Sequence, residues 1–518
     1  MPNPQVLIVG AGPTGLVLGL WLARLGVPFR ICEKNSGPGQ TSRAFGVQAR
    51  TLEFYAQLGI ADEIVQRGIE VERMRLRQGS REVSVLRFGD FGKGLSPYPF
   101  ILSLPQDEHE RVLGEKLGAL GVQIEWNTEL IGFTDSGEHV DARLRRNGRD
   151  ETCRVSFLCG CDGVHSTVRE GLHLKFPGGV YQQMFFVTDL AAEGTAVSGD
   201  MNFFLAADAL GVAFPIRSTG MVRVIGIVPG ELAGRKDLTF ELMRSQYEEH
   251  LGLRVRTVNW FSTYHVHCRV SDHFRVGRAF VLGDAGHVHS PVGGQGMNTG
   301  IGDAVNLSWK LGAVLAGRAD QSILDTYESE RIAFARTLVS TTDKAFRPML
   351  GENIAAKIIR TVLFPHLFPF LLRFSAARRL QFRLVSQTRI NYRGSPLSEG
   401  SAGRVQGGDR LPWVESADGG NFEPLKSLDW QIHVYGRAGP GLRQAVAESG
   451  IALHELPWNQ HTQKAGLERD SLYLVRPDGH VALADSKQDA EKFRNFLSRF
   501  KIAPLRATSS QLAQHSLL

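Results

Sequence analysis

The sequence contains little cysteine and no segment typical of a membrane span. It has five cysteines in 518 residues and no CxxC motif, which argues against a disulfide framework and against redox exchange through a disulfide. Cys159 and Cys161 have no second pair or histidine at zinc-finger spacing, so they are interpreted as structural thiols. With no signal peptide and no apolar run of spanning length recognised, we expect a soluble, cytoplasmic protein.

Internal repeats, low-complexity tracts and a convincing catalytic triad or acid pair are also missing. His265 with His267, and His287 with His289, each share a short segment, but neither pair has a third ligand nearby, so no metal is expected. The length suffices for two to four domains with a large core.

A dinucleotide fingerprint opens the chain. Residues 6–9 form a predicted buried strand, GAGPTG follows at 10–15 before a helix, and a second strand at 28–32 ends at Glu33. Gly10 permits the tight turn, Gly12 lets a pyrophosphate approach the helix end, and Gly15 allows close packing of helix on strand. Glu33, about twenty residues beyond, can accept from ribose hydroxyls.

A second glycine-rich loop lies far along the chain, in GDAGHVHSPVGGQGMN at 283–298. It follows a predicted strand at 279–282 and runs into a helix from about 297, so backbone amides gather at a helix N-terminus that favours electron-rich ligands. Asp284 can accept from a polyol, Pro291 stiffens the loop, and Gly294 and Gly296 permit close approach of a flat ring. An ordinary strand-to-helix turn is the alternative.

Between these loops, CDGVHSTVR at 161–169 follows a third predicted strand at 155–159. With the two glycine loops it makes the chain resemble a class A FAD-dependent aromatic hydroxylase of the phenol and polyketide hydroxylase group. DAVNLSWKL at 303–311 and YESER at 327–331 agree with this resemblance, which covers the whole length. Departures are Gly286 in place of the usual alanine and Ser290 in place of a frequent proline.

The resemblance implies a set of cofactor-binding residues. Gly10, Gly12 and Gly15 would hold the FAD pyrophosphate, Glu33 the adenosine ribose, and Asp284 the ribityl chain. Arg43 and Gln106 would contact the flavin or its phosphates, and Asp162 and Gly163 would lie near FAD and NAD(P)H. The loop around Pro291 and Gly294, with the amides of Gly296, Met297 and Asn298, would face the isoalloxazine. His289 is a candidate proton relay.

The resemblance also implies the reaction, in which NAD(P)H and O2 hydroxylate an aromatic or phenolic substrate through a C4a-hydroperoxyflavin. NADPH and NADH are not distinguished. One alternative is a monooxygenase of the same architecture that modifies or epoxidises a bulky polycyclic or drug-like compound. Another, from a different class, is a non-catalytic binder of prenylated proteins of the GDP-dissociation-inhibitor type. The intact glycine motifs disfavour that binder.

Short alternating or aromatic-rich runs between residues 181 and 270 predict a mostly antiparallel sheet that forms the substrate pocket. Five residues are candidates for its lining, because π-faces suit an aromatic guest, and plain core packing is the alternative for each. They are Phe185, Phe203, Phe214, Trp260 and Tyr264.

The net charge of +6 is concentrated between residues 346 and 393, where nine Arg or Lys face one acid, Glu352. This segment also holds an apolar run at 362–372 that is interrupted by two prolines and too short to span a membrane. A solvated basic face over a buried stripe, a dimer contact and peripheral contact with an anionic membrane are the interpretations left open. Nothing indicates nucleic-acid binding.

The fold class expected is α/β, with a Rossmann-like FAD-binding domain, an antiparallel-sheet substrate domain and a C-terminal thioredoxin-like domain without CxxC. The expected domains are residues 1–178 with 268–345 for FAD, 179–267 for the substrate sheet, 346–398 for a basic helical linker and 399–518 for the thioredoxin-like domain. A monomer or a homodimer is expected.

Overall fold

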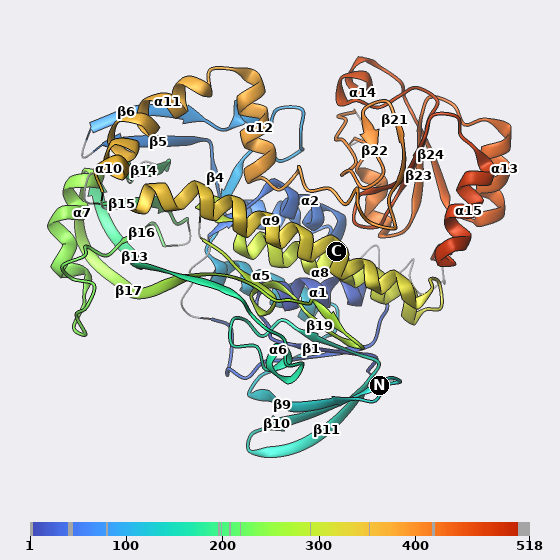
Figure 1. Ribbon diagram of the computed structural model, residues 1–518, viewed down its shortest axis with the longest axis horizontal. Helices are drawn as coiled ribbons and strands as arrows, with labels where there is room; N and C mark the ends of the chain where they lie inside the picture. Colours follow the sequence, from blue (N-terminus) through green and yellow to red (C-terminus); the bar gives the residue numbers. More distant parts are fainter. Residues whose placement is uncertain are drawn as a thin grey trace.

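The computed structural model describes residues 4–39, 45–78, 81–194, 197, 199–206, 209–217, 219–290, 292–351, 353–416 and 420–505. Two predicted site residues, Arg43 and Pro291, lie outside these ranges, as does Glu352. Figure 1 shows helices α8 (Gly296–Leu315) and α9 (Asp325–Leu350) in the middle of the molecule and the C-terminal sheet as a separate lobe at the upper right.

A six-stranded sheet lies beneath the glycine-rich motifs, in the order β18-β19-β12-β1-β2-β8. Its strands are β1 (Val6–Val9), β2 (Phe29–Cys32), β8 (Ile124–Glu125), β12 (Phe157–Gly160), β18 (Arg275–Val276) and β19 (Ala279–Val281). All neighbours pair in parallel except β18 with β19. Helix α1 (Pro13–Arg24) packs against α5 (Gln106–Ala119) and α8 (Gly296–Leu315). The three glycine motifs therefore begin at the carboxyl ends of neighbouring strands β1, β12 and β19.

The second sheet has eight strands in the order β20-β17-β13-β16-β15-β14-β5-β6. They are β5 (Arg73–Gln78), β6 (Arg81–Arg87), β13 (Gly178–Gly194), β14 (Met201–Leu205), β15 (Leu210–Pro215), β16 (Val222–Ile227), β17 (Leu253–Val270) and β20 (His287–Val288). Pairing is antiparallel apart from β14 with β5. The predicted runs between 181 and 270 all lie here. Strands β5 and β6 extend this sheet with residues from the segment expected to bind FAD.

Smaller elements surround these sheets. One three-stranded sheet comprises β9 (Thr128–Asp135), β10 (Val140–Arg146) and β11 (Arg149–Val155), and another comprises β3 (Gly46–Val47), β4 (Ile69–Val71) and β7 (Ile101–Ser103). The short helices are α2 (Ala49–Leu58), α3 (Ala61–Arg67), α4 (Gly89–Gly92), α6 (Thr167–Gly171) and α7 (Arg244–Leu251). Helix α2 ends at Gly59, whose φ of 77° forms a left-handed C-cap.

The basic segment is helical, and its apolar stretch is longer than the sequence suggested. After α9 (Asp325–Leu350) come α10 (Ile354–Ile358), the π-helical turn η6 (Ile359–Leu363), α11 (Phe364–Leu371) and α12 (Ser375–Val385). The two prolines do not end the stretch: Pro365 occupies the first turn of α11, directly after a π-turn, and Pro369 lies inside α11. Among the described residues, Ile354–Leu371 is the one helical stretch long and apolar enough to cross a membrane by length and composition, which corrects the expectation of a run too short to span.

The C-terminal lobe holds a six-stranded sheet in the order β22-β21-β26-β25-β23-β24. Its strands are β21 (Glu399–Ala402), β22 (Val405–Gln406), β23 (Gln431–Tyr435), β24 (Ala452–Leu456), β25 (Leu472–Val475) and β26 (Val481–Asp485), and its helices are α13 (Pro440–Ser449), α14 (Gln460–Ala465) and α15 (Ala490–Phe500). Strands β25 and β26 form a hairpin that turns at Asp478 and Gly479, where Gly479 has a φ of 73°.

Candidate active site

The turn after β1 has the close approaches that its glycines predict. Gly10 has a φ of 103°, and a Cβ added there would lie 2.4 Å from the Cys161 carbonyl oxygen. A Cβ on Gly15 would lie 2.0 Å from the Gly10 carbonyl oxygen, whereas one on Gly12 would meet no atom within 4 Å. The amide of Ala11 donates to Glu33 Oε2 at 3.0 Å. Protein backbone therefore leaves no room for a side chain at Gly10 or Gly15, whereas no described atom fills the space next to Gly12.

A cavity of about 380 Å³ lies beside this turn, bordered by Ala11, Glu110 and Trp126 among others. Gln106 Nε2 donates to Glu110 Oε1 at 2.7 Å, which fixes the predicted glutamine at the start of α5. Burial raises the pKa of Glu110. The cavity walls are mostly apolar, as in pockets that hold a flat heterocycle.

At the end of β12, Asp162 and Gly163 lie in the tight segment that the sequence predicted. Asp162 Oδ2 accepts from the amide of Val168 at 3.2 Å, while Oδ1 is buried without a partner among the described residues. Burial raises the pKa of Asp162. Gly163 has a φ of 78°, a conformation that favours glycine.

The loop after β19 turns sharply and ends at the N-terminus of α8. Gly283 has a φ of 58° and Gly293 and Gly294 have φ values of 77° and 61°. Asp284 is exposed at the strand end. Among the described residues no side chain caps α8, so the amides of Gly296 to Asn298 in its first turn remain available to a ligand.

The side chain of Asn298 holds this helix end to the neighbouring segment around β3. Its Nδ2 donates to the carbonyl oxygens of Gly46 and Gly294, both at 2.8 Å. Its Oδ1 accepts from the Gln48 amide at 2.9 Å and from Thr51 Oγ1 at 2.7 Å. The amide side chain therefore has a structural role that the sequence did not reveal.

Gln48 is a second residue that the sequence analysis missed. Its Nε2 donates to the Gly293 carbonyl oxygen at 2.9 Å, and its Oε1 is buried without a partner among the described residues. It precedes α2 but forms no side-chain cap there. The sequence offers one signal for this role, which is a polar residue at a strand-to-helix junction.

His289 and His287 lie on either side of Val288 but have different partners. His289 Nδ1 is 2.8 Å from the Ser290 carbonyl oxygen and so carries the proton, which leaves Nε2 as a buried acceptor beside Gly296. Burial, with the charge of His287, lowers the pKa of His289 to about 4. His287 Nε2 instead lies 2.7 Å from Asp303 Oδ2. Among the described residues no group of three or more His, Cys, Asp or Glu could hold a metal ion.

The five aromatic candidates share one face of the eight-stranded sheet. Residues opposite one another in register lie on the same face, and so do residues two apart along a strand. Phe185 pairs with Tyr264, and Asp189, four positions along, pairs with both Trp260 and Arg223. Arg223 is also opposite Phe214 on strand β15. Val212, two residues before Phe214 on the same strand, is opposite Phe203.

The aromatic candidates differ in the segments that they contact. Phe185 is buried between Tyr264 and Phe346 of α9, and Phe203 lies 6.1 Å from Phe364 of α11, ring centre to ring centre. Phe214 lies 3.6 Å from the ring of Phe45, the residue before Gly46, whose carbonyl oxygen binds Asn298. Phe214 is thus the candidate that contacts the segment bordering the α8 N-terminus.

A buried ion pair crosses the same face. Arg223 donates to Asp189 through Nε at 2.7 Å and through Nη2 at 2.8 Å, and its guanidinium lies 5.8 Å from the Trp260 ring centre. This bidentate pair places a polar, oriented group among the aromatic and aliphatic side chains of this face.

The sequence profile of a family described as "FAD binding domain" matches residues 3–342. The chain belongs to the FAD-dependent class A hydroxylases. It is similar to 6-methylpretetramide 4-monooxygenase of Streptomyces rimosus, with 35% identity over 93% of this chain and 90% of the relative. It is 31% identical to pentachlorophenol 4-monooxygenase of Sphingobium chlorophenolicum over 68% of this chain and 66% of that one. The structure of OxyS anhydrotetracycline hydroxylase from Streptomyces rimosus matches with a TM-score of 0.77 and 26% identity, over 97% of this chain and 100% of that chain.

The hydroxylase is therefore a monooxygenase whose cofactor is FAD and whose co-substrate is NAD(P)H, as predicted. The alternative of a non-catalytic binder of prenylated proteins is not retained. The fold is a mixed α/β fold like those of the FAD-dependent hydroxylases.

The residues of this hydroxylase fit FAD at independent points. The turn leaves open space at Gly12, the α8 N-terminus carries no side-chain cap, and Asp162 Oδ1 and Gln48 Oε1 are buried acceptors without partners among the described residues. Buried polar atoms of this kind normally have a partner, which a bound ligand can supply.

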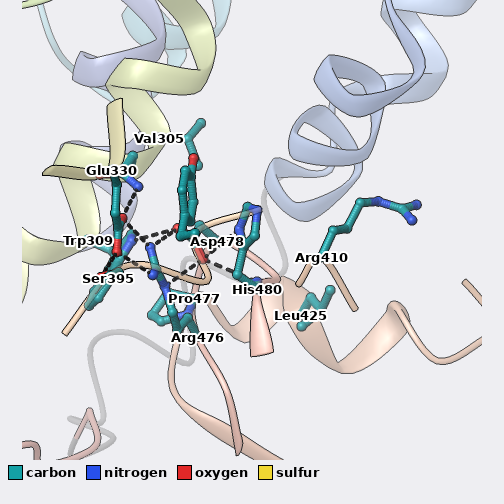
Figure 2. A network of polar contacts seen from close by, with 12 residues as sticks. Val305, Trp309, Glu330, Ser395, Arg410, Leu425, Arg476, Pro477, Asp478 and His480 are labelled. Atoms are coloured by element: carbon teal, nitrogen blue, oxygen red, sulfur yellow. Dashed lines mark hydrogen bonds and ion pairs between the residues drawn. The ribbon is translucent and has the colours of Figure 1, made fainter. Parts of the chain in front are cut away.

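A buried polar network joins the site to the C-terminal lobe (Figure 2). Arg476 donates to Glu330 Oε1 at 2.7 Å, and Lys310 donates to Glu330 Oε2 at 2.9 Å. Arg476 also contacts Asp478 at 2.6 Å, to which Trp309 Nε1 donates at 3.3 Å. Burial alone would raise the pKa of Glu330, but the charges of Arg476 and Lys310 hold it far below its usual value.

A second buried pair extends from α9 to the loop after β19. Arg331 Nε donates to Asp303 Oδ1 at 2.6 Å. Asp303 Oδ2 accepts from the Gly283 amide at 3.0 Å and lies next to His287 Nε2. The YESER motif thus supplies Glu330 to the lobe contact and Arg331 to the loop before Asp284.

Proposed function

We propose that this hydroxylase acts on a polycyclic phenol and that the aromatic face of the eight-stranded sheet holds it. The observation that carries the proposal is the contact of Phe214 with Phe45, because it brings this face next to the segment that Asn298 ties to the α8 N-terminus. Two relatives that align along nearly the whole chain are named for 6-methylpretetramide and anhydrotetracycline, which favours a multi-ring substrate.

The proposed cofactor contacts follow the geometry of the site. Gly10, Gly12 and Gly15 admit the pyrophosphate, and Glu33 accepts from the adenosine ribose, with the adenine in the adjacent cavity. Gln106, Asp162 and Gly163 line the approach to it, and Asp284 accepts from the ribityl hydroxyls. Gly294, Gly296, Met297 and Asn298 present backbone groups to the ring. Arg43 and Pro291 remain proposed contacts from the sequence alone.

FAD supplies, when bound, the redox chemistry by which NAD(P)H and O2 deliver one oxygen atom to an aromatic ring. The chain has to orient the ring, stabilise negative charge and exclude water. The first-turn amides of α8 direct donors to the place where such charge would develop. Phe214 and Trp260 would orient the substrate ring, and the Arg223–Asp189 pair would recognise a polar substituent on it.

His289 is proposed to act as a neutral hydrogen-bond partner. Because its pKa is about 4 and Nδ1–H is engaged by Ser290, Nε2 accepts a proton or hydrogen bond at neutral pH. As a proton relay it would therefore take a proton from the site first, and would not begin as an imidazolium donor.

The C-terminal lobe is proposed to be a thioredoxin-like domain with a structural role. Its central strand order and flanking helices support this assignment, and no CxxC motif is present in the sequence. We also propose the four domains with the bounds given above, with strands β5 and β6 assigned to the substrate sheet. We also propose a cytoplasmic enzyme that is a monomer or a homodimer.

The test is NAD(P)H oxidation by the FAD-loaded enzyme with simple phenols, naphthols and multi-ring phenols, with hydrogen peroxide assayed in parallel. A multi-ring phenol is expected to raise NAD(P)H oxidation without raising peroxide and to yield a product heavier by one oxygen. Turnover of simple phenols alone would contradict the proposed substrate class. Modification or epoxidation of a drug-like polycycle, without hydroxylation of a phenol, would favour the alternative.

A further inference from the structure

Exposed large apolar side chains are concentrated on the helices that follow α9. Ten of the fourteen found among the described residues lie there: Ile354, Ile358, Val362, Leu363, Leu367, Phe370, Leu371, Phe374, Leu380 and Leu384. Ile354 is 78% exposed and Phe374 58% exposed. An apolar surface this concentrated marks an interaction site more often than scattered single residues do.

The helical spacing explains why these side chains form one stripe. Ile354, Ile358 and Val362 are four residues apart, as are Phe370 and Phe374 and, on α12, Leu380 and Leu384. The opposite side is fixed to the protein, where Pro365, Leu372 and Phe382 are buried. The stripe is therefore the outer surface of an anchored helical layer.

Several contacts anchor this layer to the protein. Arg360 Nη1 donates to the carbonyl oxygens of Met349 and Gly351 at 2.7 and 2.8 Å. Gln78 of β5 donates to the Thr361 carbonyl oxygen at 2.9 Å. Phe364 packs on Phe203. These contacts hold the helix along the sheet, so it cannot leave to cross a bilayer without losing them.

Cations surround the stripe. Lys357, Arg373, Arg379, Arg383 and Arg389 are exposed, and none of them forms an ion pair with another described residue. Glu352, the one acid between residues 346 and 393, lies outside the described residues. The ten apolar residues and these five cations are here named the basic apolar face.

We propose that the basic apolar face docks on an anionic lipid surface with its helices in the plane of the interface. Apolar side chains that enter the acyl boundary and cations that meet lipid phosphates are the two components of interfacial helix binding. A second copy of the chain would bring the same positive charge to the contact, so the face is not complementary to itself. The positive charge of the face thus favours an anionic partner, and its exposed apolar side chains favour a lipid as that partner.

The position of the face suggests how docking would serve the enzyme. The helical layer lies against the side of the sheet that carries the aromatic candidates, since Phe364 of α11 contacts Phe203. A docked enzyme would hold its substrate sheet next to the lipid, where apolar aromatic compounds partition. This step rests on the proposed substrate, whereas docking itself does not.

The test is flotation of the full-length, FAD-loaded enzyme with vesicles of phosphatidylcholine alone or mixed with phosphatidylglycerol. We expect flotation with the mixed vesicles, a decrease as salt is raised, and little flotation with phosphatidylcholine alone. The triple variant Lys357→Gln, Arg373→Gln, Arg379→Gln should bind roughly 100-fold more weakly, at about 1 kcal/mol for each of the three cations. Its charge-matched control is Arg146→Gln, Arg149→Gln, Arg254→Gln, at exposed sites on other elements, which should bind like wild type.

The apolar component is tested with Phe370→Ser, Phe374→Ser against Leu242→Ser, Val276→Ser, two exposed apolar sites elsewhere. Only the first pair should lose flotation, and sedimentation velocity would report the oligomeric state of each variant. Failure of wild type to float with anionic vesicles would overturn the proposal, as would equal flotation with neutral ones. A wild-type dimer that Phe370→Ser, Phe374→Ser dissociates, without vesicle binding, would assign the face to self-association. Flotation does not depend on turnover, so a wrong substrate assignment would leave these results unchanged.

Discussion

Asp284 is the residue on which the assignment of the loop after β19 depends most directly. Its carboxylate is exposed at a strand end beside the turn at Gly283, where ribityl hydroxyls would donate to it. Loss of hydrogen bonds to a charged group costs about 1.5 to 3 kcal/mol. We expect Asp284→Ala to bind FAD roughly 10- to 100-fold more weakly in fluorescence titration. Asp150→Ala, at an exposed site on β11, is the control, and unchanged affinity in Asp284→Ala would remove it from the cofactor site.

Phe214 tests the substrate face. Truncation should raise KM and increase peroxide release, because the substrate ring loses a partner worth about 0.5 to 1.5 kcal/mol. A fall in kcat/KM of roughly 2- to 12-fold follows, measured with the compound that the panel identifies. Phe261→Ala is the matched control, since Phe261 pairs with Thr188 on the opposite face of the sheet. Equal effects of the two changes would argue against a substrate role for Phe214.

At the scale of elements, the first turn separates folding from cofactor binding. In Gly15→Ala the new methyl would lie 2.0 Å from a backbone oxygen, so α1 must move away from β1. In Gly12→Ala it would meet no protein atom and would occupy only the space proposed for the pyrophosphate. We expect Gly15→Ala to destabilise the apoprotein by about 1 to 3 kcal/mol. Gly12→Ala should keep the wild-type melting temperature of the apoprotein and lose FAD.

Thermal melting of both apoproteins, followed by FAD titration, measures this difference. A Gly12→Ala protein that binds FAD normally would contradict the proposed pyrophosphate position. Gly118→Ala is a control, because a Cβ at that exposed glycine of α5 meets no described atom within 4 Å.

Much of the fold was predictable wherever the signal is local. The fingerprint at residues 10–15, the strand that ends at Glu33 and the glycine that closes α2 each carry their meaning within a few positions. Strand β5 also has such a signal, since Met74 and Leu76 alternate with arginines, and this period-two pattern was overlooked. Its pairing with β14 could not be read from the sequence, because the partner lies more than 120 positions away.

The sequence predicted the outline of the candidate site but not the hydrogen bonds that join its distant segments. The glycines and acids at the strand ends follow from motif order. The role of Asn298 does not, because its partners Gly46 and Gln48 lie about 250 residues away. Likewise, the aromatic runs predicted a sheet, but only the register shows that all five candidates share one face.

At the scale of the whole molecule, the carboxylate of Glu330 in α9 joins this helix to α8, through Lys310, and to the hairpin of β25 and β26, through Arg476. Glu330→Gln would leave Arg476 and Lys310 buried with too little negative charge, a loss of about 3 to 5 kcal/mol by the usual cost of breaking a buried pair. We expect a clear fall in the apparent melting temperature of the apoprotein. The control is Asp150→Asn, which removes the exposed partner of Arg145 and should leave melting unchanged. Equal melting of the two variants would show that the network adds little stability.

Four histidines buried in different parts of the molecule predict acid lability. Burial lowers the pKa of His109 and His433 to about 3, and that of His289 and His480 to about 4. A folded-state pKa below the unfolded value means that stability is complete above about pH 6.5 and is lost as the pH falls toward 4. By pH 5 each histidine would cost up to about 2 kcal/mol.

Melting temperatures between pH 7.5 and 5 measure this loss. His109→Gln should reduce the dependence on pH, because His109 contacts Tyr55 and Met297 as a neutral ring. A melting temperature that stays constant over this range would contradict the neutral state of these side chains.

The network around Glu330 also bears on how the protein forms during synthesis. Glu330 leaves the ribosome 146 residues before its partner Arg476, and Lys310 leaves it 20 residues before Glu330. At about 5 to 20 residues per second, the nascent FAD-binding part waits roughly 7 to 30 seconds for the group that completes its interior. A hairpin translated long after these helices thus completes their packing, so a chain released or cleaved before Arg476 would keep Glu330 and Lys310 without their arginine partner.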